Sequence, residues 1–243
     1  MCELFGLASA RAVQCNAWLQ EFFAHSVKHC HGWGIAWLDE ENRLLKEPVP
    51  AFESETVKAL LAEELKAAHL LAHIRLASVG SLKYENSHPF VKRDRWGRVW
   101  VLEHNGTIFD GHLLDAYKAV EEGQTDSERI ACCLIDRVNR LDHAPAAEER
   151  FALAEQLIAD IAPQNKINLL FWDGEFLYVH TNLKGTLYQK ELPEGIVVAT
   201  TPLDADQWTP VPMQQLQVWR NGDYVYQGKP HAWEYFPPQE DLT

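Results

Sequence analysis

The chain has 243 residues, enough for one large domain or two small ones whose core needs neither disulfides nor a structural metal. Lysine and arginine total 22 against 35 for aspartate and glutamate, and this formal net charge of −13 disfavours binding to nucleic acid or to an anionic membrane. No apolar stretch approaches the roughly 20 residues that cross a bilayer, and no basic, apolar leader opens the chain. We therefore expect a soluble, cytoplasmic protein.

The pattern of apolar residues predicts ten strands and four helices. In chain order they are a strand over 3–8, a helix over 17–25, a strand over 34–38, a helix over 55–68 with Ser54 as its N-cap, strands over 70–76 and 99–103, helices over 126–141 and 146–161, and strands over 168–172, 176–180, 186–188, 196–200, 214–220 and 223–226.

Two turn pairs indicate how the later strands are paired. Asp173-Gly174 and Asn221-Gly222 each lie between two predicted strands, which is the strongest short-range hairpin signal a sequence offers. The C-terminal third is therefore predicted to be antiparallel. Helices and strands are grouped rather than alternating one for one, which favours an α+β layered domain over a doubly wound parallel sheet.

The cysteines show no pattern of a disulfide framework or of a structural zinc site. Their number is odd and no CxxC spacing is repeated, so we expect free thiols; they are Cys2, Cys15, Cys30, Cys132 and Cys133. His25, His29 and His31 could be interpreted with Cys30 as a metal site, but no carboxylate cluster lies nearby in the sequence, and we expect neither a metal nor a cofactor. No repeat or linker divides the chain, so we expect one domain over 1–243 with a surface tail over 230–243.

Four places in the chain could carry chemistry, and each has an ordinary alternative. Cys2 is either a small residue after Met1 or, if Met1 is removed, a thiol with its own α-amine as base. The Asn105-Gly106 pair is either a turn or an oxyanion hole. Arg75 lies in an apolar run and needs a carboxylate, from the chain or from a ligand. Asp126 opens a predicted helix, where N-capping is the usual role.

Taken together, six segments resemble the class II glutamine amidotransferases, which are N-terminal nucleophile hydrolases. They are CELFG at 2–6, HGWGIA at 31–36, HIRLAS at 73–78, ENSHPF at 85–90, HNG at 104–106 and TDSE at 125–128. Their order and spacing are most similar to the short, stand-alone branch of the family, and a weaker resemblance continues through 199–203 and 208–212. One departure is that the segment before Gly-x-Gly, which commonly carries an Asp in the family, here reads KHCH at 28–31.

The resemblance implies a four-layer αββα sandwich of two mostly antiparallel sheets flanked by helices. It also implies a role for each candidate residue. Cys2 would attack the γ-carboxamide of glutamine or of a γ-glutamyl compound and form a γ-glutamyl thioester. Asn105 and Gly106 would form the oxyanion hole. Arg75 would bind the substrate α-carboxylate with help from the Ser78 hydroxyl, and Asp126 would bind the α-ammonium group.

Two functional interpretations stay open at this point. In the first, the enzyme hydrolyses a small γ-glutamyl substrate outright or passes ammonia to a separate synthetase or acceptor subunit, because few residues follow Arg220 for a second domain. In the second, a non-catalytic module retains the fold and senses glutamine-like ligands, which a retained Met1 would favour. The sequence names neither the natural leaving group nor the oligomeric state.

Overall fold

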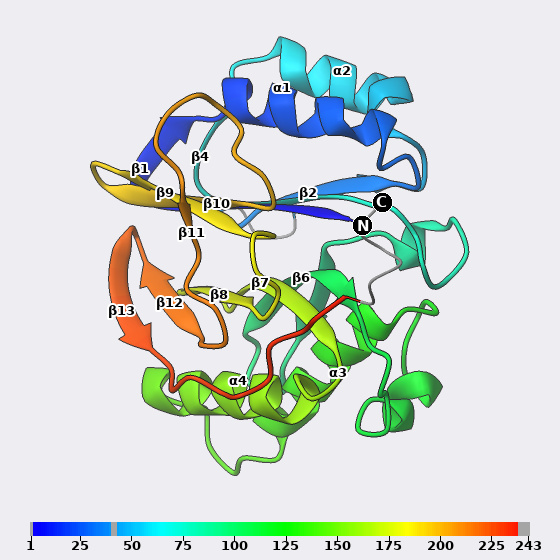
Figure 1. Ribbon diagram of the computed structural model, residues 1–243, viewed down its shortest axis with the longest axis vertical. Helices are drawn as coiled ribbons and strands as arrows, with labels where there is room; N and C mark the ends of the chain where they lie inside the picture. Colours follow the sequence, from blue (N-terminus) through cyan, green and yellow to red (C-terminus); the bar gives the residue numbers. More distant parts are fainter. Residues whose placement is uncertain (1, 40–42, 238–243) are drawn as a thin grey trace.

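The computed structural model describes residues 2–39 and 43–237. These residues form two antiparallel sheets that pack face to face, with a pair of helices over each outer surface (Figure 1). The layers therefore follow the order helix, sheet, sheet, helix. The expected α+β class and the αββα sandwich implied by the family resemblance are both confirmed.

The first sheet contains the N-terminal strand at its centre. Its strand order is β11 (Thr209–Pro210), β9 (Tyr188–Leu192), β10 (Gly195–Ala199), β1 (Glu3–Gln14), β4 (Lys66–Ile74), β2 (Trp33–Trp37) and β3 (Arg43–Glu47). Helices α1 (Asn16–Ala24) and α2 (Glu55–Ala62) cover its outer face (Figure 1). Large side chains such as Phe5, Phe22 and Trp33 fill the space between these helices and the sheet.

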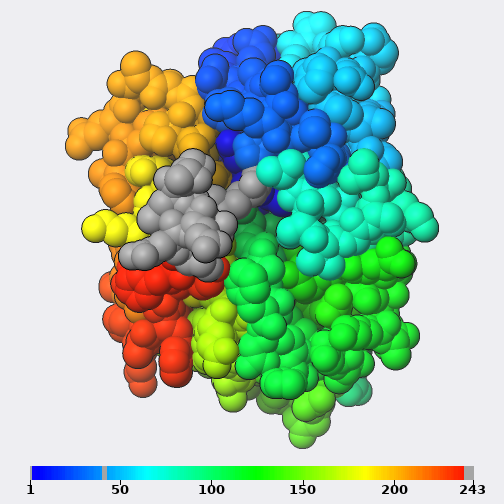
Figure 2. All heavy atoms as spheres, turned by 45° about the vertical axis from the view of Figure 1, so that its right-hand side comes forward, coloured from blue at the N-terminus to red at the C-terminus, as the bar shows by residue number. Residues whose placement is uncertain are grey.

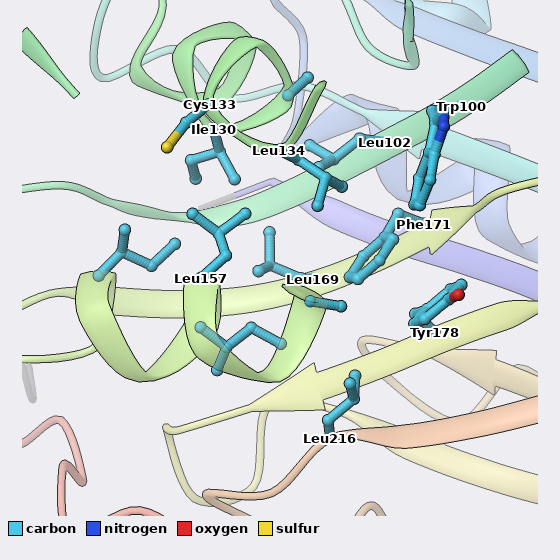
Figure 3. Close-up of a cluster of buried hydrophobic side chains, with 14 of the residues drawn as sticks. Trp100, Leu102, Ile130, Cys133, Leu134, Leu157, Leu169, Phe171, Tyr178 and Leu216 are labelled. Carbon is cyan, nitrogen blue, oxygen red and sulfur yellow. The ribbon is translucent and has the colours of Figure 1, made fainter. Parts of the chain in front are cut away.

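The second sheet is covered by the two longer helices. Its strand order is β13 (Asp223–Gln227), β12 (Gln217–Arg220), β8 (Leu177–Thr181), β7 (Lys166–Trp172), β6 (Val99–Thr107) and β5 (Phe90–Arg93), and the helices are α3 (Asp126–Asn139) and α4 (Ala147–Ile161). Figure 3 shows Leu134 and Leu157 from these helices facing Leu169, Phe171 and Tyr178 on the strands. Burying each such side chain contributes about 1.5–3 kcal/mol.

A third apolar layer lies between the two sheets. It includes Leu4 of β1, Leu71 of β4 and Leu170 of β7, all fully buried. Because successive strand residues point to opposite faces, Leu70 and Ala72 of β4 instead pack under the helices. The four remaining helical pieces are short 3₁₀ turns: η1 (His25–Val27), η2 (Ala51–Glu53), η3 (Tyr84–Asn86) and η4 (Asp115–Ala119).

Three of the four predicted helices are found within two residues of their predicted ends, but the helix predicted over 55–68 ends at Ala62. Ser54 is its N-cap, as expected, and accepts a hydrogen bond from the Val57 amide. Beyond Ala62 the tertiary structure overrides the helical pattern, because Lys66 already pairs with Gln14 of β1. The prediction for residues 63–68 was therefore wrong.

The predicted hairpins at Asp173-Gly174 and Asn221-Gly222 are confirmed as β7–β8 and β12–β13. Strands β3, β5 and β11 were missed, since the first two are edge strands with charged residues and β11 has only two residues. The strand predicted over 186–188 was placed too early, because pairing with β10 puts β9 at Tyr188–Leu192. The strand predicted over 214–220 begins only at Gln217.

The C-terminal segment lies against the second sheet as far as residue 237. The Tyr235 amide donates to the Asn182 carbonyl at 2.8 Å, and the His231 amide donates to the Gln214 carbonyl at 2.8 Å. The rest of the tail predicted over 230–243 lies outside the described residues. All five cysteines are free, as expected. Within the described part of the chain, no helix is both long and apolar enough to cross a membrane.

Candidate active site

The predicted site residues gather at one end of the sandwich, where strands of both sheets begin or end. The register of Glu3 opposite Ile74 places the start of β1 beside the end of β4. In the other sheet, the end of β6 pairs with the start of β7, with Gly106 opposite Ile167. Figure 2 shows the N-terminal residues (dark blue) recessed between the blue, teal and green segments of this face.

Cys2 is half-buried, and its sulfur lies against the backbone of one residue, Leu76, just after β4. The Leu76 amide donates to Cys2 Sγ at 3.4 Å, and the thiol lies 3.5 Å from the Leu76 carbonyl oxygen. Burial raises the pKa of the Cys2 thiol, while the Leu76 hydrogen bond and the nearby charges of Arg75 and Lys166 oppose this effect. The thiol is therefore protonated at rest, and it needs a base when it reacts.

Arg75 is 2 % exposed, and its guanidinium donates to the backbone rather than to a carboxylate. Its acceptors include the carbonyl oxygens of Val79 at 2.8 Å and Ser81 at 3.2 Å. Among the described residues, the guanidinium of Arg75 has only backbone carbonyls as hydrogen-bond acceptors and forms no ion pair with a carboxylate. Cys2 and Asp126 are nevertheless close enough to influence its pKa. Burial lowers the pKa of Arg75. A carboxylate from elsewhere in the described chain is thus not its partner.

Asn105 and Gly106 lie inside strand β6, so the alternative of a turn is wrong. Asn105 is 1 % exposed, and its Nδ2 makes no hydrogen bond to any described residue. A Cβ on Gly106 would fall 1.9 Å from the Lys166 carbonyl oxygen and 2.3 Å from His104 Nε2. Only glycine fits here, and the strand thus offers an unused amide donor beside a position free of any side chain.

Asp126 is the first residue of α3, but Thr125 is the N-cap, because its hydroxyl accepts a hydrogen bond from the Glu128 amide at 3.2 Å. The alternative of N-capping by Asp126 is therefore wrong. Its Oδ2 instead accepts from the Ile108 amide at 2.9 Å, just beyond β6, and its Oδ1 accepts from the Ser127 amide at 2.9 Å. This carboxylate therefore joins the start of α3 to the strand that carries Asn105.

The structure brings most of the candidate residues into one neighbourhood. Arg75 is within electrostatic reach of both Cys2 and Asp126, and Asp126 is bonded to the segment that follows Gly106. Ser78 is exposed, in the loop that follows Arg75. The site therefore combines a thiol, a guanidinium, a carboxylate and an unused amide donor.

Lys166 was missed by the sequence reasoning. It is the first residue of β7, it is buried, and burial lowers its pKa to about 8, while the nearby Cys2 opposes the shift. A lysine at the start of a strand normally extends into solvent, so no local pattern could have indicated this position.

Three buried histidines near the site were also not assigned a role. The rings of His73 and His88 stack with centroids 4.0 Å apart, and burial lowers the pKa of His73 to about 3. His104 Nε2–H donates to the Lys166 carbonyl at 3.2 Å, while its Nδ1 accepts from the Ser127 hydroxyl at 3.0 Å. The signal that could have found them is their place in the HIRLAS, ENSHPF and HNG segments.

The histidines considered as metal ligands have other partners. His25 Nδ1 and His29 Nε2 lie 2.8 and 3.1 Å from the Glu3 carboxylate. No group of three or more residues in the described ranges is arranged to hold a metal ion.

Two antiparallel sheets between helices, with a cysteine at the start of a central strand, define the class of N-terminal nucleophile amidotransferase folds. Comparison with known proteins identifies the family. Residues 1–194 match the family model of the class-II glutamine amidotransferases, and the chain belongs to this family as an enzyme of that type.

Individual relatives agree with this assignment. YafJ of Escherichia coli strain K12 is 32 % identical over 85 % of this chain and 82 % of its own length. Gamma-glutamyl-hercynylcysteine sulfoxide hydrolase of Mycobacterium tuberculosis strain H37Rv is 28 % identical over 79 % of this chain and 76 % of its own. Glutamine phosphoribosylpyrophosphate amidotransferase from B. subtilis shares the fold, with a TM-score of 0.64 and 16 % identity over 90 % of this chain and 47 % of its own.

Proposed function

We propose that the protein hydrolyses the γ-carboxamide of glutamine or of a γ-glutamyl amide through a γ-glutamyl thioester on Cys2. The observation that carries this proposal is the buried Arg75 guanidinium, which has no carboxylate partner among the described residues and lies near both the Cys2 thiol and the Asp126 carboxylate. One guanidinium and one carboxylate are complementary to the two charges of an amino-acid end. In this proposal Arg75 binds the α-carboxylate, assisted by Ser78, and Asp126 binds the α-ammonium group.

The proposed chemistry uses the chain's own groups. Cys2 Sγ adds to the γ-carbonyl carbon, and its proton passes to the α-amine that removal of Met1 would create. The Asn105 side-chain amide and the Gly106 backbone N–H donate hydrogen bonds to the carbonyl oxygen and stabilise its negative charge in the tetrahedral intermediate. Collapse of the tetrahedral intermediate breaks the C–N bond, and the leaving amine takes the proton. Water then attacks the thioester, releases glutamate and restores the thiol.

Hydrolysis is favoured over transfer of ammonia to a separate synthetase or acceptor subunit. The support is the relative whose printed name is a hydrolase of a γ-glutamyl compound and which covers 79 % of this chain. A separate acceptor subunit stays a prediction that co-purification would test.

The test is a substrate series with glutamate release as the readout. We expect glutamine and γ-glutamyl amides with different leaving amines to be cleaved, whereas analogues without the α-amine or the α-carboxylate lose several kcal/mol in kcat/KM, because Asp126 or Arg75 would stay desolvated without a partner. Intact mass should show loss of Met1. Equal rates with the truncated analogues would contradict the γ-glutamyl assignment, and a retained Met1 without turnover would support a glutamine-sensing module instead.

A further inference from the structure

The short segment before β2 runs antiparallel to the end of β4 and joins it by two backbone hydrogen bonds. The His31 amide donates to the Arg75 carbonyl at 2.9 Å, and the Arg75 amide donates to the Gly32 carbonyl at 2.8 Å. Gly32 has a φ of +140°, and a Cβ at this position would lie 3.1 Å from the Glu47 carbonyl oxygen. Glycine therefore lets the segment pass close to its neighbours at this point.

The His31 side chain extends this connection by one more bond. Its Nδ1 accepts a hydrogen bond from the Ala77 amide at 2.9 Å. An imidazole that accepts at Nδ1 carries its single ring proton on Nε2. His31 therefore holds the backbone on both sides of Leu76, through Arg75 on one side and Ala77 on the other. Leu76 is the residue whose amide donates to the Cys2 sulfur at 3.4 Å.

The segment that carries His31 is itself tied to the strand of the nucleophile. Glu3, the neighbour of Cys2, accepts hydrogen bonds from His25 at 2.8 Å and His29 at 3.1 Å. Burial alone would raise the pKa of the Glu3 carboxyl, but these two hydrogen bonds outweigh it and hold the pKa below its usual value. The carboxylate thus stays ionised and anchors the residues just before His31.

We propose that His31 is a positioning residue, which holds the Leu76 N–H against the Cys2 sulfur and fixes the backbone of Arg75 without touching the substrate. The inference rests on the proposed roles of Cys2 and Arg75. Its physical basis is that the Leu76 N–H stabilises a negative sulfur only while it points at that atom. Displacing a reacting group by about 1 Å can cost about 10²-fold in rate.

The experiment compares amide replacements that put an acceptor at different places. The Oδ1 of asparagine can lie where Nδ1 lies now, whereas the longer glutamine side chain places its oxygen nearer the position of Nε2. We expect His31→Asn to keep most of kcat/KM for a cleaved γ-glutamyl amide, and His31→Gln and His31→Ala to lose on the order of 10²-fold. His112→Ala is the matched control, because the His112 side chain is 95 % exposed.

A second readout does not depend on any substrate. Alkylation of Cys2 by iodoacetamide is followed against pH by mass spectrometry of the Cys2 peptide, which separates it from the half-buried Cys30 and Cys132. Because the Leu76 N–H lowers the pKa of the thiol, losing it should shift the alkylation profile to higher pH in His31→Gln and His31→Ala. The profile of His31→Asn should match the wild type. The Tm of each variant shows whether it is folded.

The outcomes separate the two proposals. If the wild type cleaves no γ-glutamyl compound but the alkylation profiles shift as expected, the proposed function fails and the role of His31 stands. If the wild type is active and folded His31→Gln matches His31→Asn in both kcat/KM and alkylation, the positioning role is overturned. If His31→Ala does not fold, the asparagine and glutamine pair still decides the question.

Discussion

Replacing Asn105 by alanine should slow the reaction without destabilising the protein. Its Nδ2 is buried and donates to no described residue, so the substitution removes no hydrogen bond donated by this amide to the described part of the chain. A buried donor without a partner costs about 1–3 kcal/mol, which the alanine variant no longer carries. This relief offsets part of the lost packing, and we expect the free energy of unfolding to change by no more than about 1 kcal/mol.

The effect on turnover should be much larger. A donor aimed at the developing oxyanion is worth about 2.7–4 kcal/mol, so kcat should fall by about 10²–10³-fold with a smaller change in KM. Asn168 provides the matched control, because it lies directly opposite Asn105 on β7 and is also fully buried. Its Nδ2 donates to Thr186 Oγ1 at 2.9 Å, and its Oδ1 accepts from Thr181 Oγ1 at 2.7 Å.

The two variants should therefore show opposite behaviour. Asn168→Ala breaks these two hydrogen bonds and a third, from Nδ2 to the Thr186 carbonyl at 3.4 Å. It should lower the free energy of unfolding by about 1–3 kcal/mol, with a smaller loss of kcat than Asn105→Ala. Glutamate release gives kcat and KM, and urea unfolding gives the stability. The reasoning is refuted if Asn105→Ala loses stability while kcat is kept, or if its KM rises at constant kcat, since Asn105 would then be a structural or a ground-state contact.

Three further outcomes follow from the site. Cys2→Ala should abolish glutamate release and keep the fold, whereas Cys132→Ala, at another half-buried cysteine, should stay active. Turnover by Cys2→Ala would exclude Cys2 as the nucleophile. Arg75→Lys should lower kcat/KM by about 10- to 100-fold, since a charge-assisted hydrogen bond contributes about 1.5–3 kcal/mol. The variant should also discriminate less against substrates without the α-carboxylate, and unchanged discrimination would contradict the role of Arg75 in binding that group. Glu103 is buried without a partner among the described residues, and burial raises its pKa well above its usual value. The folded state therefore keeps a proton that the unfolded chain loses above about pH 4.3, and stability falls as pH rises. Urea unfolding should show that the free energy of unfolding falls less between about pH 5 and 8 in Glu103→Gln than in the wild type. Equal dependence of this free energy on pH in the two proteins would exclude the explanation.

The sequence by itself determined the features that depend on neighbouring residues. Helix α3 could be predicted from its apolar spacing, and the hairpins at Asp173-Gly174 and Asn221-Gly222 from the backbone freedom that these turns need. The family resemblance rests on short segments whose order along the chain is visible directly, so it indicated Cys2 and the sandwich fold.

The tertiary structure decided what depends on partners far along the chain. Pairing with β7 extends β6 through Asn105, which no local pattern distinguishes from a turn. Pairing with β1 turns Lys66 into a strand residue and ends α2 early. The lowered pKa of Lys166 and the backbone partners of Arg75 likewise follow from burial. Burial and strand pairing depend on segments that are distant in the sequence and meet only after folding, so they cannot be predicted from a short stretch of sequence.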